Sequence, residues 1–433
     1  MPAFSSLPPL DDASLTHALR VASHLCEYIH GTDGWIGFDD FMSQALYAPG
    51  LGYYAAGSHK LASSDDTAAS GDFITAPELS PLFARTLAGP IAAVLRATGS
   101  NEVLEFGAGT GALATGLIQA LQEQGVDVQY RILEVSADLR ERQRQRLAHL
   151  GDRVQWLDAL PASFSGCVVA NEVLDAMPVR LFRWDEAGGV LERGVAVEPQ
   201  MQPMDEAPQA TAARASRVHA DAPRDDSLQA SAQGTGAPRA DAPRAFRWED
   251  RPAPEDLAQL VRERMPPLPG YVSEINLQGE AFMREMGQWL KHGAAFFLDY
   301  GFPRHEYYHP QRAAGTLMCH VRHTAHDDPL VYPGVQDITA HVDFTAMADA
   351  ALDGGLEVLG YTSQARFLMN AGLGQWLQAL QDASPAGYAR SLNAVQKLIS
   401  EAEMGELFKV LAVGRGLDAP PPGFEQGDRL GML

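Results

Sequence analysis

Short apolar runs alternate with helically spaced apolar positions along much of the chain. The run 103–106 is followed by Leu and Ile at helical spacing over 113–121. Short buried strands separated by helical patterns are typical of a sheet covered by helices. The first four runs predict a parallel sheet with helices on both faces, and three later runs extend it to a seven-stranded α/β core. The further runs lie at 128–133, 154–157, 167–170, 294–298, 356–361 and 408–413.

Changes of composition divide the chain into six predicted segments. Pro, Ala, Gln, Ser and Arg dominate residues 199–245, and such a stretch cannot bury enough apolar surface to offset its ordering entropy. It is therefore predicted to be disordered, and the small polar residues 57–70 to form a mobile loop. The predicted segments are an N-terminal helical and cap segment over the cleft (1–100), a first part of the core (101–198), the disordered insertion (199–245), an inserted helical segment on the substrate side (246–293), a second core part with a substrate-cleft loop (294–415) and a flexible C-terminal tail (416–433).

The apolar pattern also predicts elements outside the sheet. A helical apolar stripe covers residues 12–47. A hairpin is expected at 181–184 and 190–197, resumed by 246–248, and further helices at 255–265 and 279–292.

Three glycines at alternate positions follow the first strand. Gly107, Gly109 and Gly111 allow backbone to approach a ligand where a side chain would collide, and the next helix directs its N–H groups there. Both dinucleotides and S-adenosylmethionine are bound at such turns. Glu105 favours S-adenosylmethionine, whose ammonium and sulfonium suit a carboxylate that would repel a pyrophosphate. A dinucleotide site remains an alternative, because Ala112 and an acid at the end of the next strand also fit its pattern.

Polar residues stand at the ends of the first four predicted strands. Ligands of open α/β sheets bind beyond the carboxyl ends of the strands, where Glu105, Glu134, Asp158 and Asn171 are expected to lie. Glu134 is placed to accept hydrogen bonds from two ribose hydroxyls, and Asp158 to accept one from an adenine amino group. These four residues and the glycine turn form the predicted cofactor site.

Charge and composition exclude several classes of function. The formal net charge of −22 opposes binding to nucleic acid and would attract a basic protein. No apolar run approaches 18 residues, so no membrane insertion is expected. The N-terminus has no signal-peptide or transit-peptide pattern, which predicts a cytoplasmic protein.

The cysteines and histidines predict neither a disulfide framework nor a metal site. Cys26, Cys167 and Cys319 are odd in number and far apart. Cys319 lies close to His320, His323 and His326, but without the paired cysteines of a typical zinc site. This stretch is interpreted as a polar loop that shapes the substrate cleft.

Several segments together resemble the MidA family of S-adenosylmethionine-dependent methyltransferases. The resemblance covers roughly residues 40–415 apart from the insertion, and the Gly-Asp-Phe and Asn-Glu-x-x-Asp-Ala-x-Pro-Val motifs are its most specific parts. It implies a class I methyltransferase, Rossmann-like sheet. Mitochondrial members are complex I assembly factors that methylate a protein arginine, so the resemblance implies a basic protein substrate, such as a respiratory-complex subunit or its bacterial equivalent. The matching segments are 45–54, 71–78, 104–111, 171–179, 298–301, 315–317, 336–344, 362–367 and 404–411.

Arginine methylation calls for carboxylates that orient a guanidinium and stabilise its charge. Glu172 and Asp175, three residues apart after the fourth strand, are the expected pair if they share one helical turn, with Asp72 and Glu78 approaching from the N-terminal segment. A simple helix-capping role is the alternative for the pair. Two other functions also stay open: an assembly or scaffold protein that binds the cofactor without catalysis, and an NAD-dependent oxidoreductase. The apolar C-terminal helices could support a homodimer.

Overall fold

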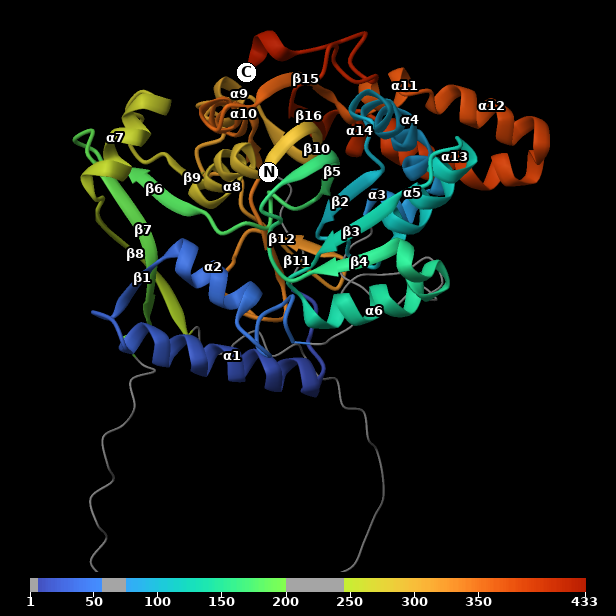
Figure 1. The fold of residues 1–433 in the computed structure, drawn as a ribbon. Coiled ribbons are helices and arrows are strands. Elements are labelled where there is room, and N and C mark those ends of the chain that lie inside the picture. Colours follow the sequence, from blue (N-terminus) through green and yellow to red (C-terminus); the bar gives the residue numbers. More distant parts are fainter. Residues whose placement is uncertain (1–6, 57–74, 200–244) are drawn as a thin grey trace, which may run out of the picture.

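A mixed sheet forms the centre of the molecule. The computed structural model describes residues 7–56, 75–199 and 245–433. Its central sheet has eight strands, in the order β15-β16-β10-β5-β2-β3-β4 with β14 paired to β10 (Figure 1). The strands are β2 (Glu102–Phe106), β3 (Gln129–Leu133), β4 (Val154–Leu157), β5 (Phe164–Asn171), β10 (Leu290–Phe302), β14 (Val342–Asp343), β15 (Glu357–Ser363) and β16 (Phe408–Arg415).

The predicted α/β class is confirmed, but the sheet is not wholly parallel. All seven apolar runs predicted as core strands lie in it, and β14 is an additional short strand. β16 runs antiparallel to both β10 and β15. The strands from β10 to β4 are parallel, so their carboxyl ends share one edge of the sheet.

Two hydrophobic cores flank this sheet. Adjacent residues of β2 point to opposite faces, so Val103 joins the core with α4 and α5 while Leu104 joins the core with α8 and α10. Figure 1 shows these helices on the two sides of the sheet, with α12 and α13 projecting from one end. The helices are α4 (Pro81–Thr98), α5 (Ala112–Glu123), α6 (Ala137–Leu147), α8 (Leu277–Trp289), α10 (Phe344–Asp353), α11 (Gln364–Asn370), α12 (Leu373–Ala383), α13 (Pro385–Ile399) and α14 (Met404–Leu407).

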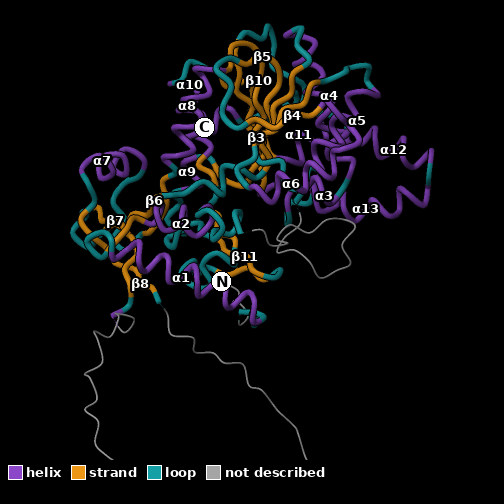
Figure 2. The backbone as a smooth tube through the Cα atoms, turned by 60° about the horizontal axis from the view of Figure 1, so that its bottom comes forward, coloured by secondary structure: helices purple, strands orange, loops and turns teal. Residues whose placement is uncertain are grey.

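Two smaller sheets lie beside the central one (Figure 2). In the larger, β6 and β7 form the predicted hairpin and β8 pairs antiparallel with β7, as expected. The N-terminal helices α1 and α2 pack on this sheet and on the three-stranded one through a shared apolar cluster. The elements are α1 (Asp12–His30), β1 (Trp35–Gly37), α2 (Phe38–Tyr47), α3 (Ala76–Leu79), β6 (Arg180–Trp184), β7 (Val190–Val197), β8 (Phe246–Pro252), α7 (Glu255–Arg264), β9 (Val272–Ile275), α9 (Arg304–Tyr307), β11 (Met318–Val321), β12 (Thr324–His326) and β13 (Asp337–Thr339).

Two predicted helices have other bounds in the structure. The stripe over 12–47 is interrupted by β1, because Gly34 takes a left-handed conformation (φ +83°) and turns the chain into pairing with β7. The helix expected at 279–292 ends at Trp289, because β10 begins pairing with β5 at Leu290. The predicted mobile loop at 57–70 and nearly all of the insertion lie outside the described residues.

The C-terminal segment was predicted to be a flexible tail, which is wrong. Phe424 is 7% exposed, and its ring lies 5.3 Å from that of Phe367. Thr362 and Asn370 donate side-chain hydrogen bonds to carbonyls of this segment. Its residues therefore pack against β15 and α11, which the local composition did not indicate.

Candidate functional site: a cavity at the strand ends

One cavity of about 830 Å³ lies beyond the carboxyl ends of β2, β3 and β5. Residues of the glycine turn and of the small sheet of β11–β13 line it. Its polar and aromatic lining includes Tyr47, Tyr54, Gly107, Gly109, Glu134, Asn171, Glu172, Asp175, Tyr300, His320, Asp337 and His341.

The glycine turn brings bare backbone to the cavity. Gly107, Gly109 and Gly111 have φ values of +60°, +53° and +83°, which L side chains rarely adopt. A Cβ atom added to Gly107 would lie 3.1 Å from Cγ2 of Val173, so the turn is also close-packed. Gly107 and Gly109 line the cavity, whereas Gly111 is the N-cap of α5.

Glu134 is held at the cavity by two hydrogen bonds. One oxygen accepts from the Ser136 backbone N–H and the other from Nε2 of Gln143, each at 2.9 Å. Nε2 of Gln143 also donates to the Gly109 carbonyl at 2.9 Å, so one fully buried side chain joins the acid to the glycine turn. Nothing in the sequence pattern indicates this role of Gln143, because both of its neighbours in the chain, Arg142 and Arg144, are charged.

Glu172 and Asp175 do lie together, but not on a helical turn. Residues 172–178 form an irregular loop, and Glu172 has a left-handed φ of +56°. Asp299, at the end of β10, accepts from the backbone N–H groups of Val173 and Leu174 at 3.1 and 2.9 Å. The loop is therefore held by a buried carboxylate from another strand and not by helical hydrogen bonds.

The carboxyl groups at this loop are withdrawn from water. Burial raises the pKa of Glu172 to about 8, and the neighbouring Asp175 adds to the effect. Burial also raises the pKa of Asp175 and of Asp299. Oδ1 of Asp175 and Oδ1 of Asn171 are buried and make no hydrogen bond to any residue that the structure describes. The cavity therefore presents acceptors suited to a cationic ligand with N–H donors.

Three tyrosines, Tyr47, Tyr54 and Tyr300, form part of the cavity wall, here called the tyrosine wall. Tyr47 and Tyr54 stack with ring centroids 5.5 Å apart, and their hydroxyls donate to the Ala176 carbonyl and to Asp337 at 2.8 and 2.9 Å. The Tyr300 hydroxyl lies beside Asp175 and offsets part of the rise in the pKa of that carboxyl group. None was predicted as a site residue, although Tyr300 follows a core strand and the other two stand in a conspicuous aromatic turn.

Four residues predicted at the site lie away from this cavity or outside the described chain. Glu105 is 2% exposed, lines a small neighbouring cavity and accepts a hydrogen bond from Tyr130 at 2.8 Å. The side chain of Asp158 is 87% exposed and forms an ion pair with Arg140 at 2.6 Å. Asp72 lies outside the described residues. Glu78 binds Arg146 at 2.7 Å beside the glycine turn.

The stretch from Cys319 to His326 forms the hairpin of β11 and β12. Cys319 is buried, whereas Met318 and His320 line the cavity, in keeping with the predicted loop at the cleft. Within the described ranges, no three His, Cys, Asp or Glu side chains converge as metal ligands would. Nor does any helix in those ranges have the length and apolar character needed to span a membrane.

Comparisons with known proteins agree with this geometry. A family model described as "Putative S-adenosyl-L-methionine-dependent methyltransferase" matches residues 86–362. A crystal structure of a Burkholderia thailandensis protein bound to S-adenosyl-homocysteine has 46% sequence identity and a TM-score of 0.84, covering 99% of this chain and 100% of that one. The mitochondrial protein arginine methyltransferases NDUFAF7 of rat and human are 25% and 26% identical, covering 93% and 90% of this chain and 86% and 82% of theirs.

The fold and the site define an α/β methyltransferase. The chain belongs to the MidA-like family of S-adenosylmethionine-dependent methyltransferases, which confirms the resemblance seen in its motifs. Its cofactor is S-adenosylmethionine. The cavity fits this group, because bare glycine backbone and an oriented carboxylate on Glu134 line it, together with oxygens of Asn171 and Asp175 that have no partner among the described residues.

Proposed function

We propose that this methyltransferase transfers a methyl group to an arginine side chain of a protein substrate, on a class I methyltransferase-type sheet. The observation that supports the substrate most directly is the loop of Glu172 and Asp175. Its buried carboxyl groups include one oxygen without a partner among the described residues, and tyrosines surround them. A guanidinium has donors only and a permanent charge, so it complements such a set of acceptors. The similarity to proteins named as arginine methyltransferases supports the same substrate.

We expect some residues of the cavity to bind the cofactor and others to bind the substrate arginine. The glycine turn, Glu134 and Asn171 hold the cofactor, which supplies an electrophilic methyl group. Glu105 and Asp158 were predicted for the cofactor as well, but Glu105 lines only the neighbouring small cavity and Asp158 is exposed and paired with Arg140, so we assign neither a direct contact. Glu172 and Asp175 orient the guanidinium nitrogen toward the methyl group, and the tyrosine wall excludes water.

The charge balance follows from the raised pKa values. In the free protein, burial keeps protons on part of the Glu172–Asp175–Asp299 group at neutral pH. Binding of the positively charged guanidinium and sulfonium would favour ionisation of these acids. We expect the ionised carboxylates of Glu172 and Asp175 to balance these two positive charges.

The test uses tritium transfer from labelled S-adenosylmethionine to ten-residue peptides with one central arginine between randomised positions, or with lysine in its place. We expect transfer to the arginine peptides alone. Glu172→Gln and Asp175→Asn should each lower transfer by about 100-fold or more while the affinity for S-adenosylhomocysteine changes by less than about threefold.

Glu285→Gln, an exposed acid on α8, is the matched control and should behave as wild type. Equal turnover in wild type and both loop variants would contradict the proposed roles. Cofactor binding without transfer to any peptide would instead favour the alternative function, a cofactor-binding assembly protein.

A further inference from the structure

His341 has a fixed position beside the proposed substrate carboxylates. It directly precedes β14, which pairs in parallel with the end of β10. Its ring stacks on Phe302 with centroids 5.4 Å apart and an interplanar angle of 3°, and it meets the edge of Tyr300 at 5.2 Å. Two aromatic contacts therefore restrict the ring, which lines the cavity.

One residue, Thr316, determines which ring nitrogen carries the proton. The backbone N–H of His341 donates to Oγ1 of Thr316 at 3.0 Å, and Nδ1 lies 3.3 Å from the Thr316 carbonyl oxygen. A carbonyl oxygen only accepts, so this hydrogen bond assigns the proton to Nδ1 and the free electron pair to Nε2. Nε2 makes no hydrogen bond to the described part of the chain.

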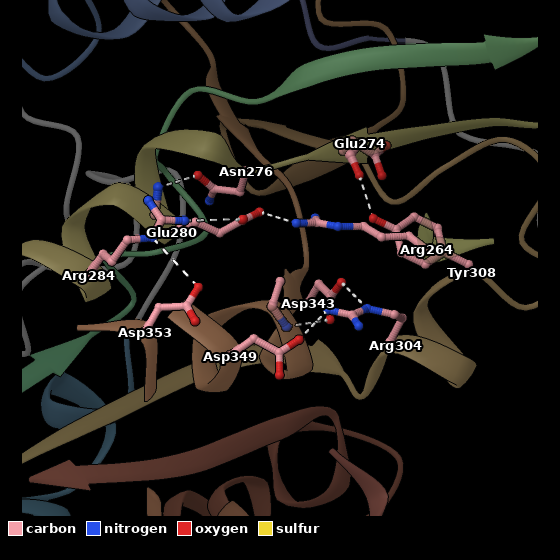
Figure 3. Close-up of polar contacts among 12 residues, drawn as sticks. Arg264, Glu274, Asn276, Glu280, Arg284, Arg304, Tyr308, Asp343, Asp349 and Asp353 are labelled. Atoms are coloured by element: carbon pink, nitrogen blue, oxygen red, sulfur yellow. Dashed lines mark hydrogen bonds and ion pairs between the residues drawn. The ribbon is translucent and has the colours of Figure 1, made fainter. Parts of the chain in front are cut away.

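Thr316 is in turn fixed by Glu274, at 1% exposure. One carboxylate oxygen accepts from the Thr316 backbone N–H at 2.8 Å and the other from its hydroxyl at 3.1 Å. Figure 3 shows Glu274 beside Tyr308, whose hydroxyl donates to the Glu274 backbone carbonyl at 3.2 Å. A Cβ atom at Gly315 would lie 2.2 Å from Oε1 of Glu274, so only glycine permits this approach.

The His341 segment is also joined directly to the catalytic loop. The backbone N–H of Ala340 donates to the Asp175 carbonyl at 2.9 Å. Tyr300 contacts the His341 ring and also neighbours the Asp175 side chain. A nitrogen bound at Asp175 would therefore lie near the ring of His341.

Arginine methylation requires a proton acceptor besides the carboxylates. As the guanidinium nitrogen forms its bond to the methyl carbon, the carbon–sulfur bond breaks and its electron pair stays on sulfur. The nitrogen must lose one proton, because otherwise a single guanidine group would carry two positive charges. The methylated product is still a cation, so it binds better to ionised than to protonated Glu172 and Asp175, and a separate proton acceptor would leave these two carboxylates ionised.

We propose that Nε2 of His341 accepts the proton released by the attacking nitrogen, and that Glu274, acting through Thr316, is the positioning residue that keeps Nε2 unprotonated. The inference rests on the proposed arginine substrate. Burial, together with the positive charges of Arg312 and Lys409, lowers the pKa of His341 to about 4, so the ring is neutral at pH 7. The proton then passes from Nε2 to water.

The first experiment measures transfer to the arginine peptides by His341→Ala and His341→Gln. Loss of a proton acceptor should lower kcat by about 100-fold or more, with KM and the affinity for S-adenosylhomocysteine changed less than about threefold. Added imidazole should restore part of the activity to His341→Ala, which loss of a merely structural ring would not allow. His292→Ala, at the opposite end of β10, is the control and should match wild type.

The second experiment needs no methyl acceptor. ¹⁵N shifts of histidine-labelled full-length protein should show His341 neutral and protonated at Nδ1 at pH 7, and Glu274→Gln should shift this tautomer balance and lower kcat more than it raises KM. A proton on Nε2 in wild type, or kcat within about threefold of wild type in both His341 variants, would overturn the proposal. If wild type methylates no peptide, the proposed substrate fails, and the nitrogen shifts still decide the state of His341.

Discussion

Gln143 connects the two halves of the cofactor side of the cavity through hydrogen bonds to Glu134 and to the Gly109 carbonyl. Its own oxygen accepts from Nε1 of Trp156 at 2.9 Å. Gln143→Leu would leave these groups unpaired, which costs about 1–3 kcal/mol per buried group. We expect the affinity for S-adenosylhomocysteine to fall about tenfold in calorimetry. The control is Gln145→Leu, at an exposed position of the same helix, which should bind S-adenosylhomocysteine as wild type does. If Gln143→Leu also bound with wild-type affinity, Gln143 would not have this role.

Glu105 predicts a pH dependence of stability. Burial raises its pKa from 4.5 to about 8, so the folded protein binds a proton that the unfolded chain has lost in this interval. The contribution of Glu105 to stability is therefore fully present below pH 4.5 and is lost as the pH rises through about 8. Thermal unfolding should show a smaller decline of Tm between these pH values in Glu105→Gln than in wild type.

Glu102→Gln on the same strand is the control, because Glu102 is only half-buried and forms an ion pair with Arg131. An identical pH slope for Glu105→Gln and wild type would count against a protonated Glu105 in the folded protein.

At the scale of elements, the C-terminal segment completes the core beside β15. Gly360 leaves room for the ring of Phe424, since a Cβ atom there would lie 2.3 Å from the ring. Phe424→Ala should lower the free energy of unfolding by about 3–5 kcal/mol, as for other buried phenylalanines. Met432→Ala, which removes an exposed side chain of the same segment, should have almost no effect on urea unfolding. Similar values for the two variants would mean that the segment adds little stability.

The elements of the site come from parts of the chain that are far apart. Asp299 on β10 holds the loop after β5, and Asn276 at the start of α8 donates to the Leu174 carbonyl of that loop at 2.9 Å. The spacing of Glu172 and Asp175 predicted a helical turn, because spacing reflects local contacts only. The structure has an irregular loop there instead, and the distant residue Asp299 holds it by accepting hydrogen bonds from its backbone.

At the scale of the whole molecule, the insertion lies between two paired strands. Val197 pairs with Phe246, and the Glu198 backbone N–H donates to the Ala245 carbonyl at 2.9 Å. The chain ends on either side of the insertion, at residues 199 and 245, are therefore close together. An Asn-Gly turn in place of residues 200–244 should close the hairpin between β7 and β8. We expect a Tm within a few degrees of wild type and unchanged affinity for S-adenosylhomocysteine. A variant that fails to fold would show that the fold requires the insertion.

The sequence by itself determined the sheet strands, the glycine turn and the residues at the strand ends, because these depend on local periodicity and on backbone conformation. It also placed Glu134, Asn171, Glu172 and Asp175, which follow apolar strands directly and so reach the ligand edge of any such sheet. Only the tertiary structure decided the state of these groups. Gln143 fixes Glu134 and Asp299 holds the loop of Glu172 and Asp175, while burial sets the charge of these acids. Dielectric surroundings and long-range contacts exist only in the folded chain.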